Sequence, residues 1–111
     1  MDFVDFVKQV KTSGYDGIEM SLPLATGEKE FIIKSIKEHN LLHIAQHWET
    51  EDTDFSEHKK EYRERITNLA SSSPILINSQ TGKDFFTFEQ NAELIAIANE
   101  ISGQHGIWTS Y

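Results

Sequence analysis

Apolar and polar positions alternate with two different periods along this chain. Four segments carry apolar residues at helical spacing, and four shorter segments between and after them have the alternation or short apolar run of a strand. The helical stripes are Phe3, Phe6, Val7 and Val10; Phe31, Ile32, Ile33 and Ile36; Phe55, His58 or Lys59, Tyr62, Ile66 and Leu69; and Phe88, Ala92, Ile95, Ala98 and Ile101. The strand segments are residues 17–22, 41–47, 75–78 and 107–111.

Residues that start and stop helices lie between these segments. Polar caps precede three of the stripes: Asp2, Asp54 with Glu57 three residues on, and Thr87 with Gln90 three residues on. Residues that end helices follow three of them: Gly14, Asn40 and Gly103. The caps and stops therefore support four helices and four strands in strict alternation.

This order predicts one α/β domain over residues 1–111 with a parallel sheet and right-handed crossovers. An open nucleotide-binding sheet is the alternative to a closed barrel, but it usually has a glycine-rich turn after a strand, and this chain has none. Polar residues instead follow or end the strands: Glu19, His47, Asn78 and Gln80. A TIM barrel builds its site from such positions, so we expect a partial barrel of about four strands and four helices, a parallel half-barrel.

Composition and charge narrow the possible partners. Of the 111 residues, 38% are apolar and 25% are charged, and the net charge is -8. The only basic cluster, within residues 59–65, alternates with glutamates as a solvated helix face does, so no nucleic-acid partner is expected. No apolar run is long enough to span a membrane, so we expect no membrane partner. The lack of cysteine fits the reducing cytoplasm, where we place the chain.

Two motifs resemble the sugar-phosphate isomerase/epimerase family, which has a xylose-isomerase-like TIM barrel. Gly14-Tyr15-Asp16-Gly17-Ile18-Glu19 is similar to the segment that enters the second strand in that family. Asn78-Ser79-Gln80-Thr81-Gly82-Lys83-Asp84 is similar to the segment after its fourth strand, with Gln80 at a position where the family has histidine. The motifs are short, but their order and spacing span nearly the whole chain.

The resemblance implies a parent barrel of roughly 250 residues that isomerises or epimerises a sugar or sugar phosphate. It also implies a divalent metal (Mn, Mg, Co or Zn), held by ligands on later strands. By the resemblance, this chain corresponds to strands two to five and ends before the first ligand. We therefore expect a truncated family member that binds no catalytic metal of its own and has no isomerase or epimerase turnover.

Four residues are candidates for binding a sugar. Glu19 is expected to point into the barrel if its neighbours Ile18 and Met20 face the helices, although a mouth-level structural pair is an equal alternative. His47 lies at the site end of its strand and is a candidate contact for a substrate oxygen. His43 has the same parity but is about 13 Å away, so the two cannot share a metal, and a core role suits it better. Asn78 and Gln80 carry amides that can fix hydroxyls or satisfy loop backbone groups.

The amino-acid sequence leaves three functional hypotheses open. The first is a fragment of a metal-dependent sugar isomerase or epimerase. The second is a small binding module whose half-barrel pairs with a second copy as a homodimer. The third is a fragment of a DNA-repair endonuclease of the same superfamily, which the acidic charge disfavours. A homodimer is expected because four strands leave an inner face and two edge strands uncovered.

Overall fold

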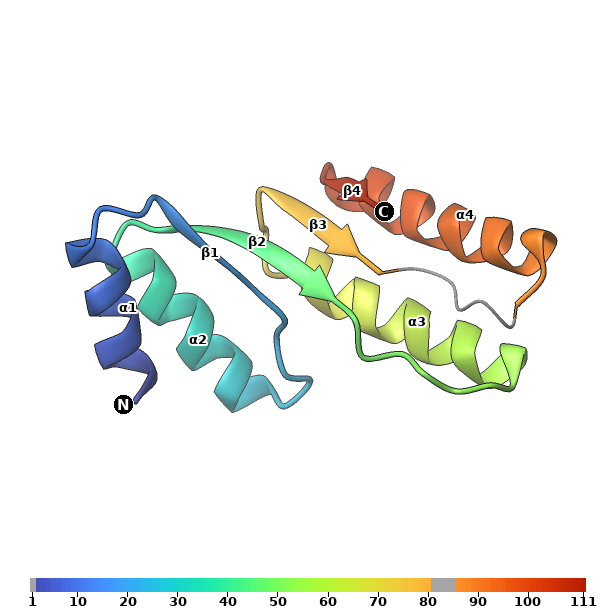
Figure 1. Ribbon diagram of the computed structural model, residues 1–111, viewed down its shortest axis with the longest axis horizontal. Coiled ribbons are helices and arrows are strands. Elements are labelled where there is room, and N and C mark those ends of the chain that lie inside the picture. Colours follow the sequence, from blue (N-terminus) through green and yellow to red (C-terminus); the bar gives the residue numbers. More distant parts are fainter. Residues whose placement is uncertain (1, 81–85) are drawn as a thin grey trace.

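The structure, a computed structural model, describes residues 2–80 and 86–111. These residues form a four-stranded parallel sheet with four helices (Figure 1). The elements, in chain order, are α1 (Phe3–Thr12), β1 (Gly17–Met20), α2 (Thr26–Glu38), β2 (Leu42–His47), α3 (Phe55–Ala70), β3 (Leu76–Ser79), α4 (Phe88–His105) and β4 (Trp108–Ser110). The strands lie in the order β1-β2-β3-β4, and every neighbouring pair is parallel. The predicted α/β class and parallel half-barrel are thereby confirmed.

The helix starts follow from the caps that the sequence contains. The Asp2 carboxylate accepts a hydrogen bond from the Asp5 N–H, and the Asp54 carboxylate accepts from the N–H groups of Ser56 and Glu57. Thr87 and Gln90 form the reciprocal capping box. These side chains satisfy N–H groups that have no partner inside the helix, so α1, α3 and α4 begin where predicted. Helix α2 begins at Thr26 after Ala25 and has no side-chain cap.

One predicted helix end is wrong. Gly14 and Asn40 follow α1 and α2 with positive φ angles of 90° and 54°, as predicted. Helix α4, however, continues through Gly103 to His105 and is capped by Gly106, whose φ is 67°. A glycine inside a helix costs only about 1 kcal/mol relative to alanine, so α4 extends to the glycine that adopts the left-handed conformation.

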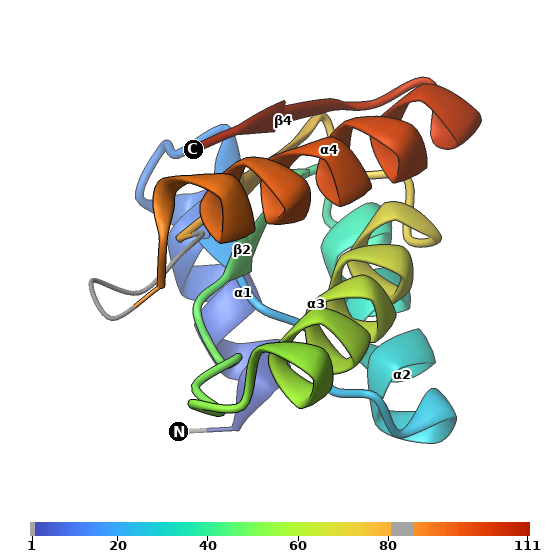
Figure 2. The same ribbon diagram turned by 90° about the vertical axis from the view of Figure 1, so that its right-hand side faces the viewer.

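Two hydrophobic clusters hold the helices against one face of the sheet. The larger cluster joins α3 and α4 to β2 and β3 through residues such as Tyr62, Ile66, Ala45, Ile77 and Leu94. The smaller one joins α1 and α2 to β1; its buried members are Val7, Ile18, Ile36 and Leu41. Figure 2 shows the helices packed beside the strands in a view turned by a right angle. The two clusters divide the molecule into a half with α1 and α2 and a half with α3 and α4.

The expected buried stripes are correct for α3 but not throughout α1, α2 and α4, and Phe6 of α1 is exposed. His58, not Lys59, completes the buried stripe of α3. Phe31 of α2 and Phe88 and Ile95 of α4 are exposed, whereas Leu94 and Ile97 are buried. Helix α4 is apolar on two faces, so spacing alone could not show which face meets the sheet.

The other face of the sheet, called the inner face below, is not covered by any described residue of 2–80 and 86–111. Because side chains alternate along a strand, Ile18, Ala45 and Ile77 face the helices and their neighbours face the opposite way. The inner face carries Gly17, Glu19, Leu42, Ile44, Gln46, Leu76, Asn78, Trp108 and Ser110. This face corresponds to the interior of a barrel.

Candidate functional site

The inner face is polar at one end and apolar at the other. Register places the polar residues at the carboxyl ends of the strands; they are Glu19, Gln46, Asn78 and Ser110. Toward the amino ends lie the apolar residues Leu42, Ile44, Leu76 and Trp108. A TIM barrel has the same division, with packed apolar layers below and the site at the carboxyl end. The polar end is therefore the candidate functional site.

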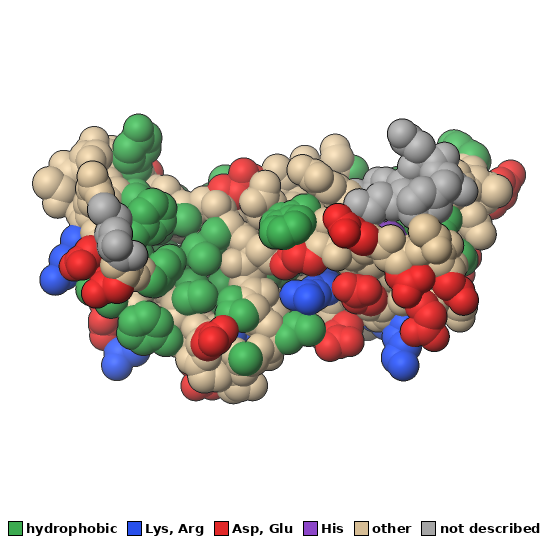
Figure 3. Space-filling model, turned by 60° about the horizontal axis from the view of Figure 1, so that its bottom comes forward, with side chains coloured by type: hydrophobic (Ala, Val, Ile, Leu, Met, Phe, Trp, Pro, Cys, Tyr) green, Lys and Arg blue, Asp and Glu red, His purple; other side chains and the backbone are tan. Residues whose placement is uncertain are grey.

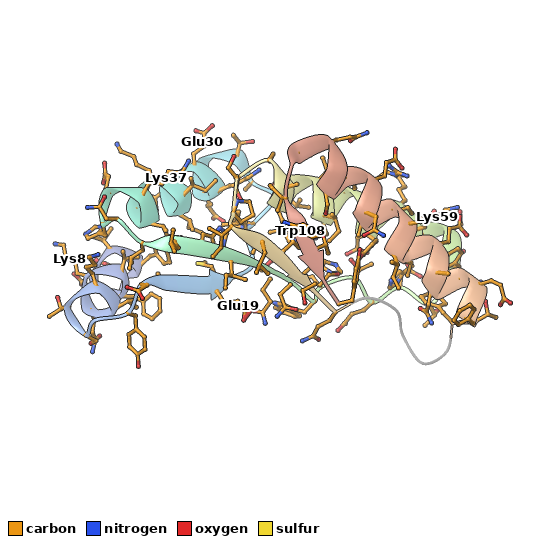
Figure 4. All side chains as sticks on the ribbon, turned by 90° about the horizontal axis from the view of Figure 1, so that it is seen from above. Lys8, Glu19, Glu30, Lys37, Lys59 and Trp108 are labelled. Atoms are coloured by element: carbon orange, nitrogen blue, oxygen red, sulfur yellow. The ribbon has the colours of Figure 1, made fainter. Side chains whose placement is uncertain are left out.

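Glu19 and Asn78 meet at this polar end although they are 59 residues apart in the chain. The Asn78 side-chain amide donates a hydrogen bond of 2.9 Å from Nδ2 to Glu19 Oε1, and this contact crosses over β2. Figure 4 shows Glu19 on β1, at one edge of the sheet, with Trp108 on β4 at the other edge. The pair presents a carboxylate and an amide side by side on the inner face. The strand parity of Glu19 predicted its direction, and a structural pair of this kind was the equal alternative to a sugar-binding role.

Gln80 lies just beyond β3 and is exposed. Its backbone N–H donates to the carbonyl of His47 at 2.9 Å, which extends the pairing of β2 with β3 by one residue. Among the described residues, no hydrogen bond joins its side chain to Glu19 or Asn78. The rest of the second family-like motif, residues 81–84, lies outside the described residues.

The structure does not bring His47 to the inner face. His47 has the same parity as Ala45 and is only 1% exposed, on the side that the helices cover. Its Nε2 is hydrogen-bonded to Thr50 Oγ1 at 2.7 Å and its Nδ1 to Ser79 Oγ at 3.2 Å. The edge of the ring meets Tyr62 with centroids 4.9 Å apart. Within the part of the chain that the structure describes, His47 is thus packed between β2 and α3, on the face of the sheet opposite to Glu19.

His43 faces the helices as well, and burial lowers its pKa. Desolvation of the charged ring is the main cause, and the hydrogen bond from Nε2 to the Met20 carbonyl opposes it only in part. The neutral ring is therefore favoured in the folded chain.

We expect acid to destabilise the fold through His43. Below its ordinary pKa of 6.5, the unfolded chain binds a proton that the folded chain resists, so the free energy of unfolding falls as the pH drops from there through the lowered pKa. Urea unfolding of the wild type and of His43→Gln at pH 7.5 and 5.5 measures this. The variant retains a donor for the Met20 carbonyl and is expected to lose less stability between the two pH values. An equal loss in both proteins would rule His43 out as the cause.

A second polar cluster at the carboxyl ends of the strands was not predicted. The Ser21 hydroxyl donates to Glu49 Oε2, the Trp48 N–H donates to Glu49 Oε1 at 3.0 Å, and Arg65 Nη1 lies 3.5 Å from Glu49 Oε2. Burial raises the pKa of Glu49, but these hydrogen bonds, another from its own backbone N–H and the charge of Arg65 together hold it below its usual value. The cluster ties the loop after β1 to the loop after β2 and to α3.

The sequence contains a signal for some, but not all, of the site residues that were not predicted. Gln46 and Ser110 share the inner-face parity of Glu19 and Asn78, so correct strand registers would have revealed them. Glu49 follows β2 closely, but nothing in its local sequence indicates that Arg65 of α3 pairs with it. That pairing depends on how α3 packs against the sheet.

The described residues do not fit a divalent metal by themselves. Within residues 2–80 and 86–111, no three His, Asp or Glu side chains gather closely enough to hold a metal ion. At the inner face, Glu19 and Asn78 offer one carboxylate and one amide, whereas catalytic zinc sites use three protein ligands. The metal that the resemblance implies therefore has no ligand set among these side chains.

Comparisons with known proteins add no family assignment. No family model matches the chain, and a search of the curated proteins finds no match. No helix in the described part of the chain is both long and apolar enough to cross a membrane.

Proposed function

We propose that this chain is half of a sugar-phosphate isomerase or epimerase barrel, and that the Glu19–Asn78 pair binds hydroxyl groups of a sugar or sugar phosphate. The observation that carries the proposal is the 2.9 Å hydrogen bond that brings these two side chains together on the inner face. Their place at the carboxyl ends of parallel strands supports it, because that end holds the active site in TIM-barrel enzymes. The family-like motifs that contain Glu19 and Asn78 support it as well.

The chemistry of the pair suits adjacent hydroxyl groups. A carboxylate only accepts hydrogen bonds, whereas an amide both donates and accepts. Each hydroxyl of a sugar also donates and accepts, so one hydroxyl can donate to Glu19 while its neighbour accepts from Asn78. Hydrogen bonds to an ionised group are stronger than those between neutral groups. We therefore assign most of the binding energy to Glu19.

The residues around the pair fit the same proposal. Gln46 lies beside Asn78 in register, and Ser110 lies on its other side. Both carry groups that can hydrogen-bond to a polyhydroxylated ligand. In the parent enzyme this face would position the sugar, while the metal-dependent step would depend on ligands outside the described residues. The 111-residue chain is accordingly proposed to bind a sugar without converting it, in the cytoplasm.

The DNA-repair alternative has less support. The net charge of -8 opposes contact with a phosphate backbone. Lys59 and Arg63, which belong to the one basic cluster, form ion pairs with Glu93 and Glu100 of α4. Their charges are thus already balanced within the fold.

Loss of the Glu19 carboxylate is expected to weaken sugar binding strongly. A hydrogen bond to a charged group contributes about 1.5–3 kcal/mol, so Glu19→Ala should raise the Kd by roughly 10- to 100-fold. Titration calorimetry with a pentose phosphate, a hexose phosphate and inorganic phosphate measures it. Glu30→Ala is the matched control, because Figure 4 shows Glu30 on α2, away from the inner face.

The titration also distinguishes recognition of the sugar hydroxyls from recognition of the phosphate group. The proposal expects both sugar phosphates to bind more tightly than inorganic phosphate, and expects Glu30→Ala to bind as the wild type does. Equal affinity for inorganic phosphate, or an unchanged Kd in Glu19→Ala, would argue against hydroxyl recognition by this pair.

A further inference from the structure

Helix α4 has a second apolar face that the described residues cover only in part, where the Tyr111 hydroxyl bonds to the Ile95 carbonyl and to Asn99 Oδ1. Its buried face meets the sheet through Leu94, Ile97, Ala98 and Ile101. Its acidic face turns to α3, where Glu93 and Glu100 pair with Lys59 and Arg63. The remaining face is exposed and uncharged, and at helical spacing it carries Phe88, Ala92, Ile95, Ala96, Asn99 and Gly103. A helix that is apolar on two faces is typically packed on both.

An open hollow lies beside this face, between α4 and the edge strand β4. Its volume is about 550 Å³, and Gly103, Gly106, Ile107 and Trp108 contribute to its wall. Trp108 is 83% exposed, which is unusual for so large an apolar side chain. A Cβ placed on Gly103 would meet nothing within 4 Å, so the hollow is not filled by the chain itself.

The opposite edge of the sheet carries protruding aromatic side chains. Phe6 of α1 is 42% exposed, and Tyr15, just before β1, is 66% exposed. Tyr15 lines both a shallow hollow on α1 and one on the inner face beside Leu42 and Ile44. Figure 3 shows hydrophobic side chains gathered over the half of the molecule that holds α1 and α2, whereas acidic side chains gather toward the other end. Tyr15 thus connects the hollow on α1 with the hollow on the inner face.

The shape of the molecule also indicates that it is not packed as a closed unit. Its radius of gyration is 15.0 Å, with extents of 45 × 26 × 23 Å. A compact domain of this length has a radius of gyration of about 13 Å. The sheet has two edges, β1 and β4, that lack a neighbouring strand among the described residues. Exposed edges and an exposed apolar face together favour association.

We propose that two copies of this 111-residue chain associate to close one barrel, each covering the edges and the inner face that further strands would cover in a longer parent. In this dimer β4 of one copy lies beside β1 of the other, parallel to it, and the same contact recurs on the opposite side. A two-fold axis along the barrel then relates two half-barrels of four strands. Tyr15 and Phe6 of each copy enter the hollow between α4 and β4 of its partner. The two inner faces, each with its apolar residues toward the amino ends of the strands, pack against each other.

The surface available is of the size that a stable dimer needs. At 150–250 Å² for an aromatic side chain, the exposed parts of Phe6, Tyr15 and Trp108 amount to roughly 400 Å². That is about half of the ~800 Å² that each partner buries in a standard interface. Leu42, Ile44 and Leu76 of the inner face and Ile95 of α4 add to it. Among the described strand residues of the inner face, only Glu19 carries a charge, which fits the depletion of charged residues in interface cores.

Light scattering coupled to gel filtration tests the dimer directly. The wild-type chain is expected at twice its mass of 12.7 kDa. Gly103→Arg should give the monomer, because the arginine would project into the hollow, and its Cβ meets no atom of its own chain within 4 Å. Gln104→Arg is the matched control: it adds the same charge one residue later, on the face toward Glu100, and should remain a dimer. Tyr15→Glu, on the other edge, should also give the monomer.

Each remaining outcome contradicts the proposal. A wild-type monomer at a chain concentration on the order of 1 mM would show that the apolar edges need no second copy. Oligomers larger than two would show that the edges pair without closing a barrel. A dimer that persists in both Gly103→Arg and Tyr15→Glu would use another surface. Circular dichroism establishes that both variants are folded. The proposed dimer does not rest on the proposed function. It is argued from exposed apolar surface and open sheet edges, and its test measures mass, whereas sugar binding is measured by calorimetry.

Discussion

Replacing His47 with alanine is expected to lower the free energy of unfolding by about 2–4 kcal/mol. The ring is 1% exposed and fills the space between β2 and α3, with its edge against Tyr62. Its removal leaves a cavity and takes away the hydrogen bonds to Thr50 and Ser79. Urea unfolding followed by circular dichroism measures the change.

The same variant distinguishes a core histidine from a ligand-binding one. Because His47 lies on the face opposite to Glu19, His47→Ala is expected to bind sugar phosphate as the wild type does, under conditions where it is folded. His105→Ala, at the exposed end of α4, should cost less than about 1 kcal/mol. A His47→Ala protein of wild-type stability that has lost sugar binding would return His47 to the site.

Replacing Gly17 with alanine is expected to destabilise the fold by about 1–3 kcal/mol. A Cβ at this position would lie 2.6 Å from the carbonyl oxygen of Leu42 and 3.1 Å from its carbonyl carbon. These are backbone atoms of β2, so they cannot turn aside as a flexible side chain would. Strand β1 must therefore move away from β2, and Glu19 should move with it. We expect a lower urea midpoint and weaker sugar binding together.

Gly27 provides the matched control for this substitution. A Cβ there would meet nothing within 4 Å, and Gly27 lies in the first turn of α2. Alanine is a better helix former than glycine, so Gly27→Ala should stabilise the chain by roughly 0.5–1 kcal/mol. The two alanine substitutions should thus have opposite signs. A Gly17→Ala protein as stable as the wild type would show that β1 and β2 are not packed as closely as described.

The order of elements could be predicted because local chemistry decides it. The caps Asp2, Asp54 and Thr87 satisfy N–H groups that no residue far along the chain can reach as easily. Apolar and polar residues alternate along β1 in the printed sequence. Once Ile18 is taken to face the helices, Glu19 must therefore point to the inner face. Local signals of this kind were sufficient for the α/β class and for one half of the Glu19–Asn78 pair.

The side of a strand or helix that packs against the core could not be predicted where both sides carry similar residues. In β2, His43 and His47 alternate with Leu42, Ile44 and Gln46, so neither parity is clearly the apolar one. Register with Ile18 and Ile77 decides the matter, and register is a property of the whole sheet. The contact of Arg65 with Glu49 likewise depends on the placement of α3 against the sheet.

The central claim, that Glu19 and Asn78 form a sugar-binding pair, is tested most directly by the side-chain amide resonances of Asn78. In a nitrogen-15 NMR titration with a sugar phosphate, these resonances are expected to shift in the wild type, together with those of Gln46. In Glu19→Ala the same titration should leave them nearly unchanged, while the fold persists. A titration in which the Asn78 amide does not shift, or shifts equally without the Glu19 carboxylate, would contradict the account.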